Sequence, residues 1–351
     1  MTSILEEVKP ESLSKTPTSI ILPMRDESSN AERIINEVIE EISEHENCEI
    51  LVIDSNSSDE TSEIAKQTLD KSALDRKRWK IITAERPGKS HAVNLALRIC
   101  KSEIIIMIDA DVTLEPGWLK KFQISLATKN VGVASGIEIR NEIKGNSTRQ
   151  YYRSYSNKLR SLESSHDTTP VLEGGLISWR KSALEDFLLD EGVNADDAQI
   201  TFRAIRNGYR TIVNPKIVFY DKGNSKNQTL RSVRRSQGLS RVLLRNRDLC
   251  KNAPRVRARR AIFHALTLYV FFPWALFLFL VNPLVLAWSQ NYVPFDLQYV
   301  SISMLPFLIL TNLGRSVLWG ASISLVSHLL FLLGVSFSTW TPSRNRIPQQ
   351  D

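Results

Sequence analysis

The chain has 351 residues, enough for one large domain or two ordinary ones, and a net charge of +7 that is unevenly distributed. Its three cysteines, Cys48, Cys100 and Cys250, lie far apart and lack the spacing of a metal or redox site, so we expect all three to be reduced. Residues 1–17 are polar and charged, so we expect a polar N-terminal tail there and no signal peptide.

Apolar strands alternate with helical segments in the part of the chain that follows. We expect strands at residues 18–24, 49–54, 79–83 and 103–109. Between them, apolar residues such as Ile34, Ile35 and Val38 recur at helical spacing. The strands are mostly apolar and do not alternate between apolar and polar residues, which is typical of a parallel sheet covered by helices on both faces. The sequence therefore predicts an α/β fold with a mostly parallel sheet, in which ligands bind beyond the C-terminal ends of the strands.

Charged side chains follow all four predicted strands. The residues concerned are Arg25 and Glu27 with the neighbouring Pro23, Asp54, Lys89, and the pair Asp109 and Asp111. One polar strand end is common, and Asp54 alone is more often a helix cap, but four such ends at one edge indicate a binding site. Cations that hold a phosphate, together with carboxylates that hold Mg²⁺ or Mn²⁺, would explain this mixture.

Asp109 and Asp111 are separated by one residue at the end of the fourth predicted strand. On a strand, two such side chains project to the same side. Each negative charge then makes ionisation of the other more costly. We therefore expect a cationic side chain or a metal ion beside this pair.

The second half of the chain adds further candidates. Gly174 and Gly175, in "VLEGGLISW", leave room for a ligand to approach the backbone. Asp196 and Asp197 stand where a helix should begin, ahead of apolar residues at helical spacing. Helix capping is the alternative explanation for these acids, but two acids are more than capping needs.

The C-terminal part of the chain is apolar. Residues 261–340 contain only two charged side chains, Asp296 and Arg315. The candidate spans are residues 261–288, 316–340 and, shorter, 300–313. The first two exceed the roughly 20 residues that cross a bilayer. Core helices of a soluble domain are the alternative, but uncharged runs of this length are rare outside membranes. We predict a transmembrane region at 261–340 with two or three spans, followed by a tail at 341–351.

A basic segment precedes the first candidate span. Residues 231–260 carry eleven Lys or Arg and one acid, Asp248. Flanks rich in Lys and Arg stay in the cytoplasm, so we expect an integral membrane protein whose first 260 residues are cytoplasmic. Such a segment attracts anionic lipid head groups, and we expect basic juxtamembrane helices at 231–260. The adjacent span favours lipid over nucleic acid as the partner of this charge.

The order of these motifs resembles that of the family 2 glycosyltransferases, an inverting, membrane-associated family with a GT-A fold. The quoted segments are "ILPMRDE", "LVIDSNSSDET", "RPGKSHAVNLAL", "DAD" and "NADDAQITFRAIRNGYR". The resemblance covers roughly residues 18–245. It implies a GT-A-like domain at 18–230 that binds a nucleotide-diphosphate sugar.

The resemblance also implies roles for individual residues. The implied donor-binding residues are Pro23, Arg25, Glu27, Asp54 at the nucleobase, Lys89, Asn94 and Asp109. Asp111 would bind the metal, and Asp197, preceded by Asp196, would be the catalytic base. The family often continues with Gln-x-x-Arg-Trp, whereas "RRSQGLSRVLLR" has Gln237 and Arg241 without the Trp and with different spacing. Candidates at the acceptor and diphosphate end are Gly174, Gly175, Gln237 and Arg241.

We therefore predict an inverting, membrane-bound glycosyltransferase that depends on Mg²⁺ or Mn²⁺. Its acceptor would be a lipid-linked, polyprenyl-phosphate-linked or other membrane-proximal molecule. Two alternatives are open: a membrane-anchored nucleotide-sugar-binding protein without turnover, and a metal-dependent nucleotidyl or phosphoryl transferase. The absence of a Gly-x-x-x-x-Gly-Lys-Ser/Thr loop argues against the P-loop form of the latter. A binding protein would not need Asp197, so that residue separates the alternatives.

Overall fold

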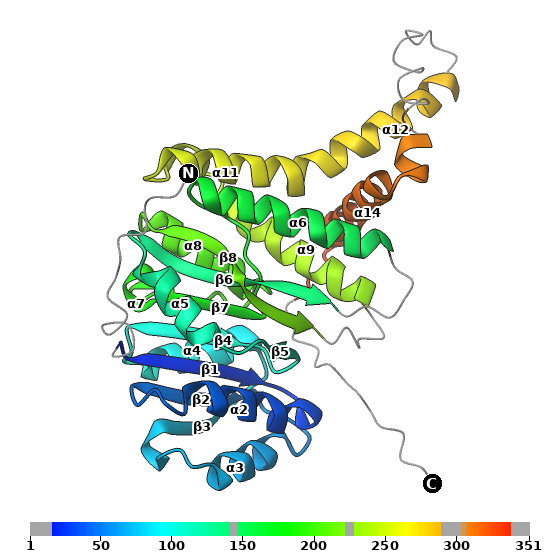
Figure 1. Cartoon of the computed structure of the whole chain (residues 1–351). Coiled ribbons are helices and arrows are strands. Elements are labelled where there is room, and N and C mark those ends of the chain that lie inside the picture. The colour runs from blue at the N-terminus through cyan, green and yellow to red at the C-terminus, as the bar shows by residue number, and fades with distance from the viewer. Residues whose placement is uncertain (1–15, 141–146, 222–227, 289–303, 305, 338–351) are drawn as a thin grey trace, which may run out of the picture.

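The computed structural model describes residues 16–140, 147–221, 228–288, 304 and 306–337 (Figure 1). An eight-stranded sheet with the order β3-β2-β1-β4-β7-β6-β8-β5 forms its centre. The strands are β1 (Thr18–Met24), β2 (Cys48–Asp54), β3 (Trp79–Thr83), β4 (Ile104–Ile108), β5 (Val112–Leu114), β6 (Val131–Arg140), β7 (Leu176–Arg180) and β8 (Arg210–Asp221). The four strands predicted in the first half are present, and two of them have the predicted bounds.

The sheet is mixed, which corrects the prediction of a mostly parallel sheet. β3, β2, β1 and β4 are parallel to one another, and β6 is parallel to β8. β7 runs antiparallel to both β4 and β6, and β5 runs antiparallel to β8. Because β6 and β7 are antiparallel, β6 ends and β7 begins at the same edge of the sheet. Their connection, which includes α6 (Ser147–His166), therefore stands over the edge where β1, β2 and β4 also end.

Helices cover both faces of the sheet, as the apolar strands predict. One face carries α2 (Ser28–Ile42), α3 (Thr61–Lys71) and α5 (Trp118–Ala127); the other carries α4 (Lys89–Ile99), α7 (Lys181–Leu184) and α8 (Asp196–Arg206); a 3-10 turn, η1 (Arg76–Arg78), precedes β3. Alternate strand residues face opposite layers, so Ile20 and Leu22 pack with α2 while Ile21 packs with α4. Burial of each such side chain stabilises the fold by about 1.5–3 kcal/mol.

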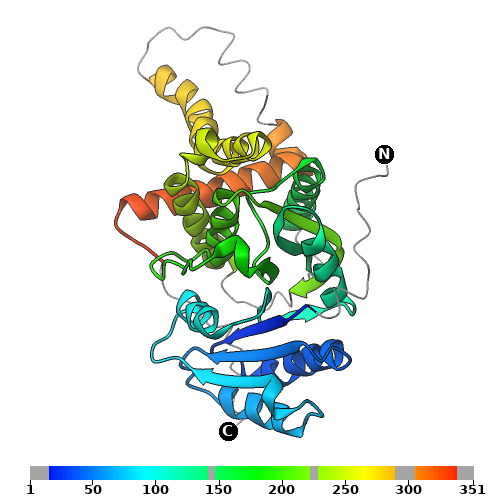
Figure 2. The ribbon, with the colours of Figure 1, turned by 90° about the vertical axis from the view of Figure 1, so that its left-hand side faces the viewer.

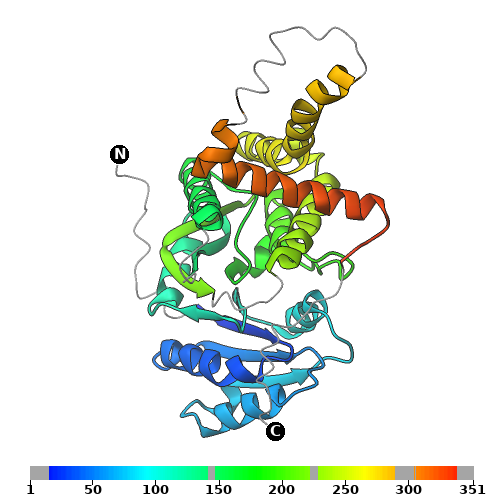
Figure 3. The ribbon, with the colours of Figure 1, turned by 90° about the vertical axis from the view of Figure 1, so that its right-hand side faces the viewer.

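The remaining helices form a third layer. They are α9 (Gln228–Arg245), α10 (Leu249–Asn252), α11 (Val256–Leu266), the π-helical η2 (Thr267–Phe271), α12 (Phe272–Trp288) and α14 (Asn312–Leu332). Figure 2 shows this layer at the opposite end of the molecule from β3, with α12 projecting away. In Figure 3, α14 runs across α6 and α9.

Two helical segments are long and apolar enough to cross a membrane, Val256–Val281 and Asn312–Leu332. They overlap the predicted spans at 261–288 and 316–340. Of the third predicted stretch, residues 304 and 306–310 are helical, whereas residues 300–303 and 305 lie outside the described residues, as does the tail at 341–351. The two segments are identified as possible spans from their length and apolar composition alone.

Helix α9, whose residues fall in the basic segment predicted at 231–260, packs into the folded domain. Val233, Val242 and Leu243 are buried, and the last two belong to a core shared with α8 and α11. Gln237 and Ser240 are buried on the same helix. The basic charge of this helix had suggested lipid, but the helix is part of the folded core.

Candidate active site

A cavity of about 250 Å³ lies beyond the strand ends and is walled by α6, α9 and α14. Five residues predicted from the sequence line it: Lys89, Asp109, Gly174, Asp196 and Asp197. Residues from the start of α4, the end of β4 and the start of α8 thus meet at one place. The edge predicted from the strand ends is the floor of this cavity.

Lys89 is the cationic partner expected beside the aspartate pair. Its Nζ lies 2.7 Å from Asp109 Oδ1 and 3.0 Å from Asp196 Oδ2. Burial acts to lower the pKa of Lys89, but the carboxylates of Asp109 and Asp196 outweigh it and raise that pKa above its ordinary value. Lys89 therefore stays charged and holds together acids from two distant parts of the chain.

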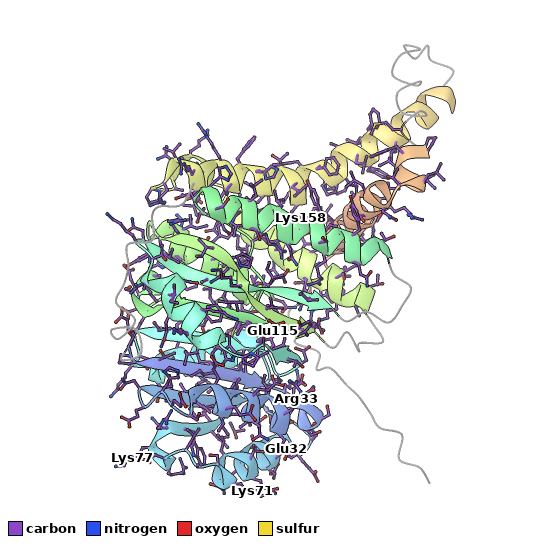
Figure 4. The ribbon with its side chains drawn as sticks, in the orientation of Figure 1. Glu32, Arg33, Lys71, Lys77, Glu115 and Lys158 are labelled. Atoms are coloured by element: carbon purple, nitrogen blue, oxygen red, sulfur yellow. The ribbon has the colours of Figure 1, made fainter. Side chains whose placement is uncertain are left out.

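Asp109 and Asp111 lie in the turn between β4 and β5 rather than on a strand, which corrects the sequence prediction. Arg33 of α2 holds this turn, because its guanidinium donates to the carbonyl oxygens of Val112 at 2.7 Å and Ala110 at 3.0 Å. In Figure 4, the labelled residues Arg33 and Glu115, which follows β5, lie on the same side of the molecule. The sequence analysis missed Arg33, since nothing in the pattern of α2 distinguishes it from a solvent-exposed helical arginine.

The two aspartates of the turn have different partners. Burial raises the pKa of Asp109, and Asp111 and Asp196 raise it further, while Lys89 opposes them. Asp111 Oδ2 lies 3.0 Å from Arg231 Nη2 of α9. Arg231 is thus paired with the carboxylate that the resemblance assigns to the metal.

Asp197 is a half-buried acid at the first turn of α8. Burial and the neighbouring Asp196 raise the pKa of Asp197 to about 7, although the Ala198 amide donates to it at 2.8 Å. A carboxyl group with such a pKa exists in both protonation states near neutral pH. It can therefore accept a proton from a substrate hydroxyl.

The glycines ahead of β7 have packing reasons of their own. A Cβ at Gly174 would lie 3.2 Å from Asp197, and a Cβ at Gly175 would lie 2.8 Å from the ring of Phe219. The predicted room for a ligand is therefore taken by Asp197 and Phe219. Gly174 still lines the cavity, and the carbonyl of Gly175 accepts from the Asp109 amide at 3.0 Å.

Three arginines of α9 line the cavity: Arg231, Arg234 and Arg235. Their spacing places them on one face of the helix. Burial lowers the pKa of Arg234 to about 10, and the positive charges of Arg231 and Arg235 add to this effect. The sequence analysis assigned them to lipid head groups, and only their i, i+3, i+4 spacing could have indicated a shared face.

Gln237 and Arg241 do not join the cavity residues. Gln237 donates to the carbonyl of Val335 at 2.9 Å and accepts from the amide of Phe337 at 2.9 Å. Arg241 donates to the carbonyl of Gly192 at 3.0 Å. Both side chains hold α9 against other segments, so the structure does not place them at the acceptor or diphosphate end.

The donor-side residues lie at the ends of β1 and β2, beside the cavity but outside its lining. Pro23 is in β1, and Arg25 follows it, half-buried. Glu27 is buried and accepts from Asn30 at 2.8 Å. The carboxylate of Asp54 accepts from the hydroxyl of Ser57 at 2.5 Å and from its amide at 3.2 Å.

Asn94, a predicted donor-binding residue, is buried and bonded within the protein. Its amide nitrogen donates to the carbonyl of Leu189 at 2.9 Å, and its oxygen accepts from the Leu189 amide at 2.8 Å. The same nitrogen reaches Glu191 at 3.2 Å. Asn94 therefore holds the segment that leads into Asp196 and Asp197 against α4.

The acids of the turn suit a hard divalent cation. No group of three or more His, Cys, Asp or Glu side chains that could hold a metal occurs among the described residues. Mg²⁺, however, is often bound by one or two carboxylates, with phosphate oxygens of the substrate completing its shell. Asp111, with Asp109 nearby, provides such oxygens, so the residues fit an ion that arrives with a diphosphate.

Gly238 sets the distance between α9 and the start of α8. A Cβ at this position would lie 2.2 Å from the carbonyl oxygen of Asn194. We expect Gly238→Ala to displace α9, lower the free energy of unfolding by about 1–3 kcal/mol and reduce turnover. Thermal unfolding would measure this, with Leu244→Ala at an exposed position of α9 as the control. An unchanged melting temperature would contradict the contact.

The chain is similar to known glycosyltransferases. The models of Glycosyl transferase family 2 and Glycosyl transferase family group 2 match residues 19–188 and 104–341. Glycosyltransferase AglE of Haloferax volcanii is 24% identical over 193 residues, 54% of this chain and 62% of AglE, so the match spans less than two thirds of that relative.

Solved structures share the fold. Mannosyltransferase PcManGT from Pyrobaculum calidifontis, in complex with GDP-Man and Mn²⁺, superposes with a TM-score of 0.76 at 20% identity and covers 93% of both chains. S. aureus TarS 1-349 in complex with UDP superposes with a TM-score of 0.54 at 15% identity, covering 90% of this chain and 91% of TarS 1-349. These likenesses show that the α/β domain has the GT-A-like fold.

Proposed function

The chain belongs to glycosyl transferase family group 2, and from this premise we propose that it transfers a sugar from a nucleotide-diphosphate sugar to an acceptor at a membrane surface, with inversion and with a divalent metal. One observation carries the proposal: Lys89 joins Asp109, near the proposed metal ligand Asp111, to Asp196, next to the proposed base Asp197. Donor-binding and base residues thus face one cavity.

The residues of this chain divide the work between the donor and the acceptor. Lys89 and the arginines of α9 would offset the charge that develops on the leaving diphosphate, and Asp111 would hold the metal ion. The ion supplies further charge stabilisation when bound. Asp197 would accept the proton of the attacking hydroxyl. Pro23, Arg25, Glu27 and Asp54 would bind the nucleoside beside the cavity.

The C-terminal helices support a membrane location. Val256–Val281 and Asn312–Leu332 have the length and apolar composition of spans, and basic residues precede the first. We propose an integral membrane protein with a cytoplasmic catalytic domain and a lipid-linked or membrane-proximal acceptor. α14 packs against α6 and α9 and lines the cavity, so the apolar C-terminal part of the chain lies next to the proposed site of transfer.

The metal and the donor can be tested together. PcManGT was solved with GDP-Man and Mn²⁺ and TarS with UDP-GlcNAc, so GDP- and UDP-sugars are the first donors to try. We expect the detergent-purified protein to release GDP or UDP from one donor with a membrane-lipid extract, to stop with EDTA, and to recover with Mn²⁺ or Mg²⁺. Release that EDTA does not affect would contradict the metal assignment. Binding of a donor without any release would favour the binding-protein alternative.

A further inference from the structure

The cavity has two unlike halves. The half beside β4 and α9 carries Lys89, Arg231 and Arg234, while the charge of Arg235 is stabilised by Glu138 and Glu173 as well as by Asp221 and Asp109. The half beside α6, η2 and α14 carries three aromatic residues, Tyr152, Tyr269 and Trp319. The mechanism above uses the first half and leaves the aromatic half without a role.

The aromatic residues are held firmly in the cavity wall. The rings of Tyr152 and Trp319 pack edge to face, with their centroids 5.4 Å apart and an interplanar angle of 69°. Gly320 permits this contact, because a Cβ there would lie 2.9 Å from the Tyr152 ring. Ser316 of α14 donates to the carbonyl of Thr148 on α6 at 2.9 Å. α14 is thus fixed against α6 with its tryptophan at the cavity.

The arginines on the aromatic side are already neutralised. Arg153 lies 2.6 Å from Glu138, and Arg160 is paired with Glu173. Such pairs keep N–H donors and carboxylate oxygens available to hydroxyl groups but offer no net positive charge. Aromatic faces beside paired donors and acceptors suit a sugar ring, which has apolar faces and a polar rim.

The balance of charges around the whole cavity also favours an uncharged sugar as the acceptor. Among the described residues, six cationic side chains line it against five carboxylates. Asp111 and Glu138 add two carboxylates paired with lining arginines. A donor diphosphate and a divalent metal offset each other, so donor binding leaves no positive surplus. A lipid phosphate would add about 1.5 to 2 further negative charges.

We propose that the acceptor's reacting group is a sugar hydroxyl of a saccharide, seated against Trp319 and Tyr152, and not a bare lipid phosphate. This inference rests on the proposed function and names its acceptor class. The acceptor oxygen forms a bond to the anomeric carbon of the donor sugar as the bond from that carbon to the diphosphate oxygen breaks. The bonding electrons leave with the nucleoside diphosphate, and the hydroxyl proton passes to Asp197. A phosphate acceptor, already ionised, would not need this base.

The test compares two kinds of acceptor on the full chain in detergent. One is geranylgeranyl phosphate; the other is a set of geranylgeranyl-diphosphate-linked mono-, di- and trisaccharides. Each is offered with GDP- and UDP-sugars and a divalent metal, and the products are identified by mass spectrometry. We expect transfer to at least one saccharide lipid and none to geranylgeranyl phosphate. Transfer to geranylgeranyl phosphate, or to none of the saccharide lipids, overturns the inference. Calorimetric donor binding is measured in parallel, and its absence would overturn the proposed function itself.

Variants of Trp319 test the seat directly. We expect Trp319→Ala to raise the KM for the saccharide lipid by about tenfold while the donor KM stays unchanged, and Trp319→Tyr to restore most of the affinity. Val326→Ala, at an exposed position of the same helix, is the matched control and should behave as the unchanged protein. Equal effects of Trp319→Ala on donor and acceptor KM would show that the tryptophan only supports the fold, and would also overturn the inference.

Discussion

Replacing Asp197 with asparagine is expected to lower kcat by about 10²–10⁴-fold, because general base catalysis contributes on that order. Asparagine keeps the size of the side chain but cannot take the acceptor proton. Donor binding should persist, since Lys89 and Asp111 are unchanged. Turnover and calorimetric donor binding measure the two effects separately. Asp70→Asn, on the exposed side of α3, is the matched control.

The same residue gives the enzyme a predictable pH dependence. Since the pKa of Asp197 is raised to about 7, the rate constant kcat/KM should rise with pH and level off above that value. Stability should change in the opposite direction. A raised carboxyl pKa favours folding below the ordinary value of 3.8, and this contribution is lost as the pH rises through about 7. Asp197→Asn should therefore melt higher than the parent protein at pH 8, and by a smaller margin at pH 5. A variant that melts lower at pH 8 would contradict the burial of this charge.

The parallel half of the fold was predictable because local patterns determine it. Each of β1 to β4 is mostly apolar, and each is followed by a polar segment or a helix of regular spacing. The antiparallel β7 was not predictable from such patterns. Its direction depends on where α6 returns the chain, and no local signal in residues 167–175 encodes that return. The prediction of the sheet was therefore right for its first half, and it was wrong in describing the whole sheet as mostly parallel.

The candidate site, like the sheet, was predictable only in part. Asp196, Asp197, Lys89 and Asp109 follow strands or begin helices, and the fold brings such ends together at one edge. The contacts of residues that bind distant parts of the chain could not be predicted from local patterns. Asn94 lies among donor-site residues in sequence, yet its amide is bound to Leu189, 95 positions away. The α9 arginines belong to a segment whose composition suggests a membrane surface, and only tertiary packing shows that one face of this helix closes the cavity.

The ion pairs of Lys89 connect Asp109 on the donor side of the candidate site with Asp196 beside the proposed base. Lys89→Met would leave Asp109 and Asp196 buried beside each other without the cation that now lies within 3.0 Å of both. Removing one partner of a buried ion pair costs about 3–5 kcal/mol, because the remaining charge is uncompensated. We expect an apparent melting temperature about 10 °C lower. We also expect kcat/KM to fall by about 10²–10³-fold, since a cation near the leaving diphosphate is lost.

The stability and catalytic effects of Lys89 can be separated with a second substitution. In Lys89→Met/Asp109→Asn, one of the two stranded carboxylates is neutral, so most of the lost stability should return. Activity should not return, because the double variant still lacks the ammonium group of Lys89 and its residue 109 no longer carries a charge. Lys120→Met, at an exposed position of α5, controls for the loss of a lysine as such. If the double variant regained activity with stability, Lys89 would be a structural residue, and charge stabilisation of the leaving diphosphate would have to come from the α9 arginines alone.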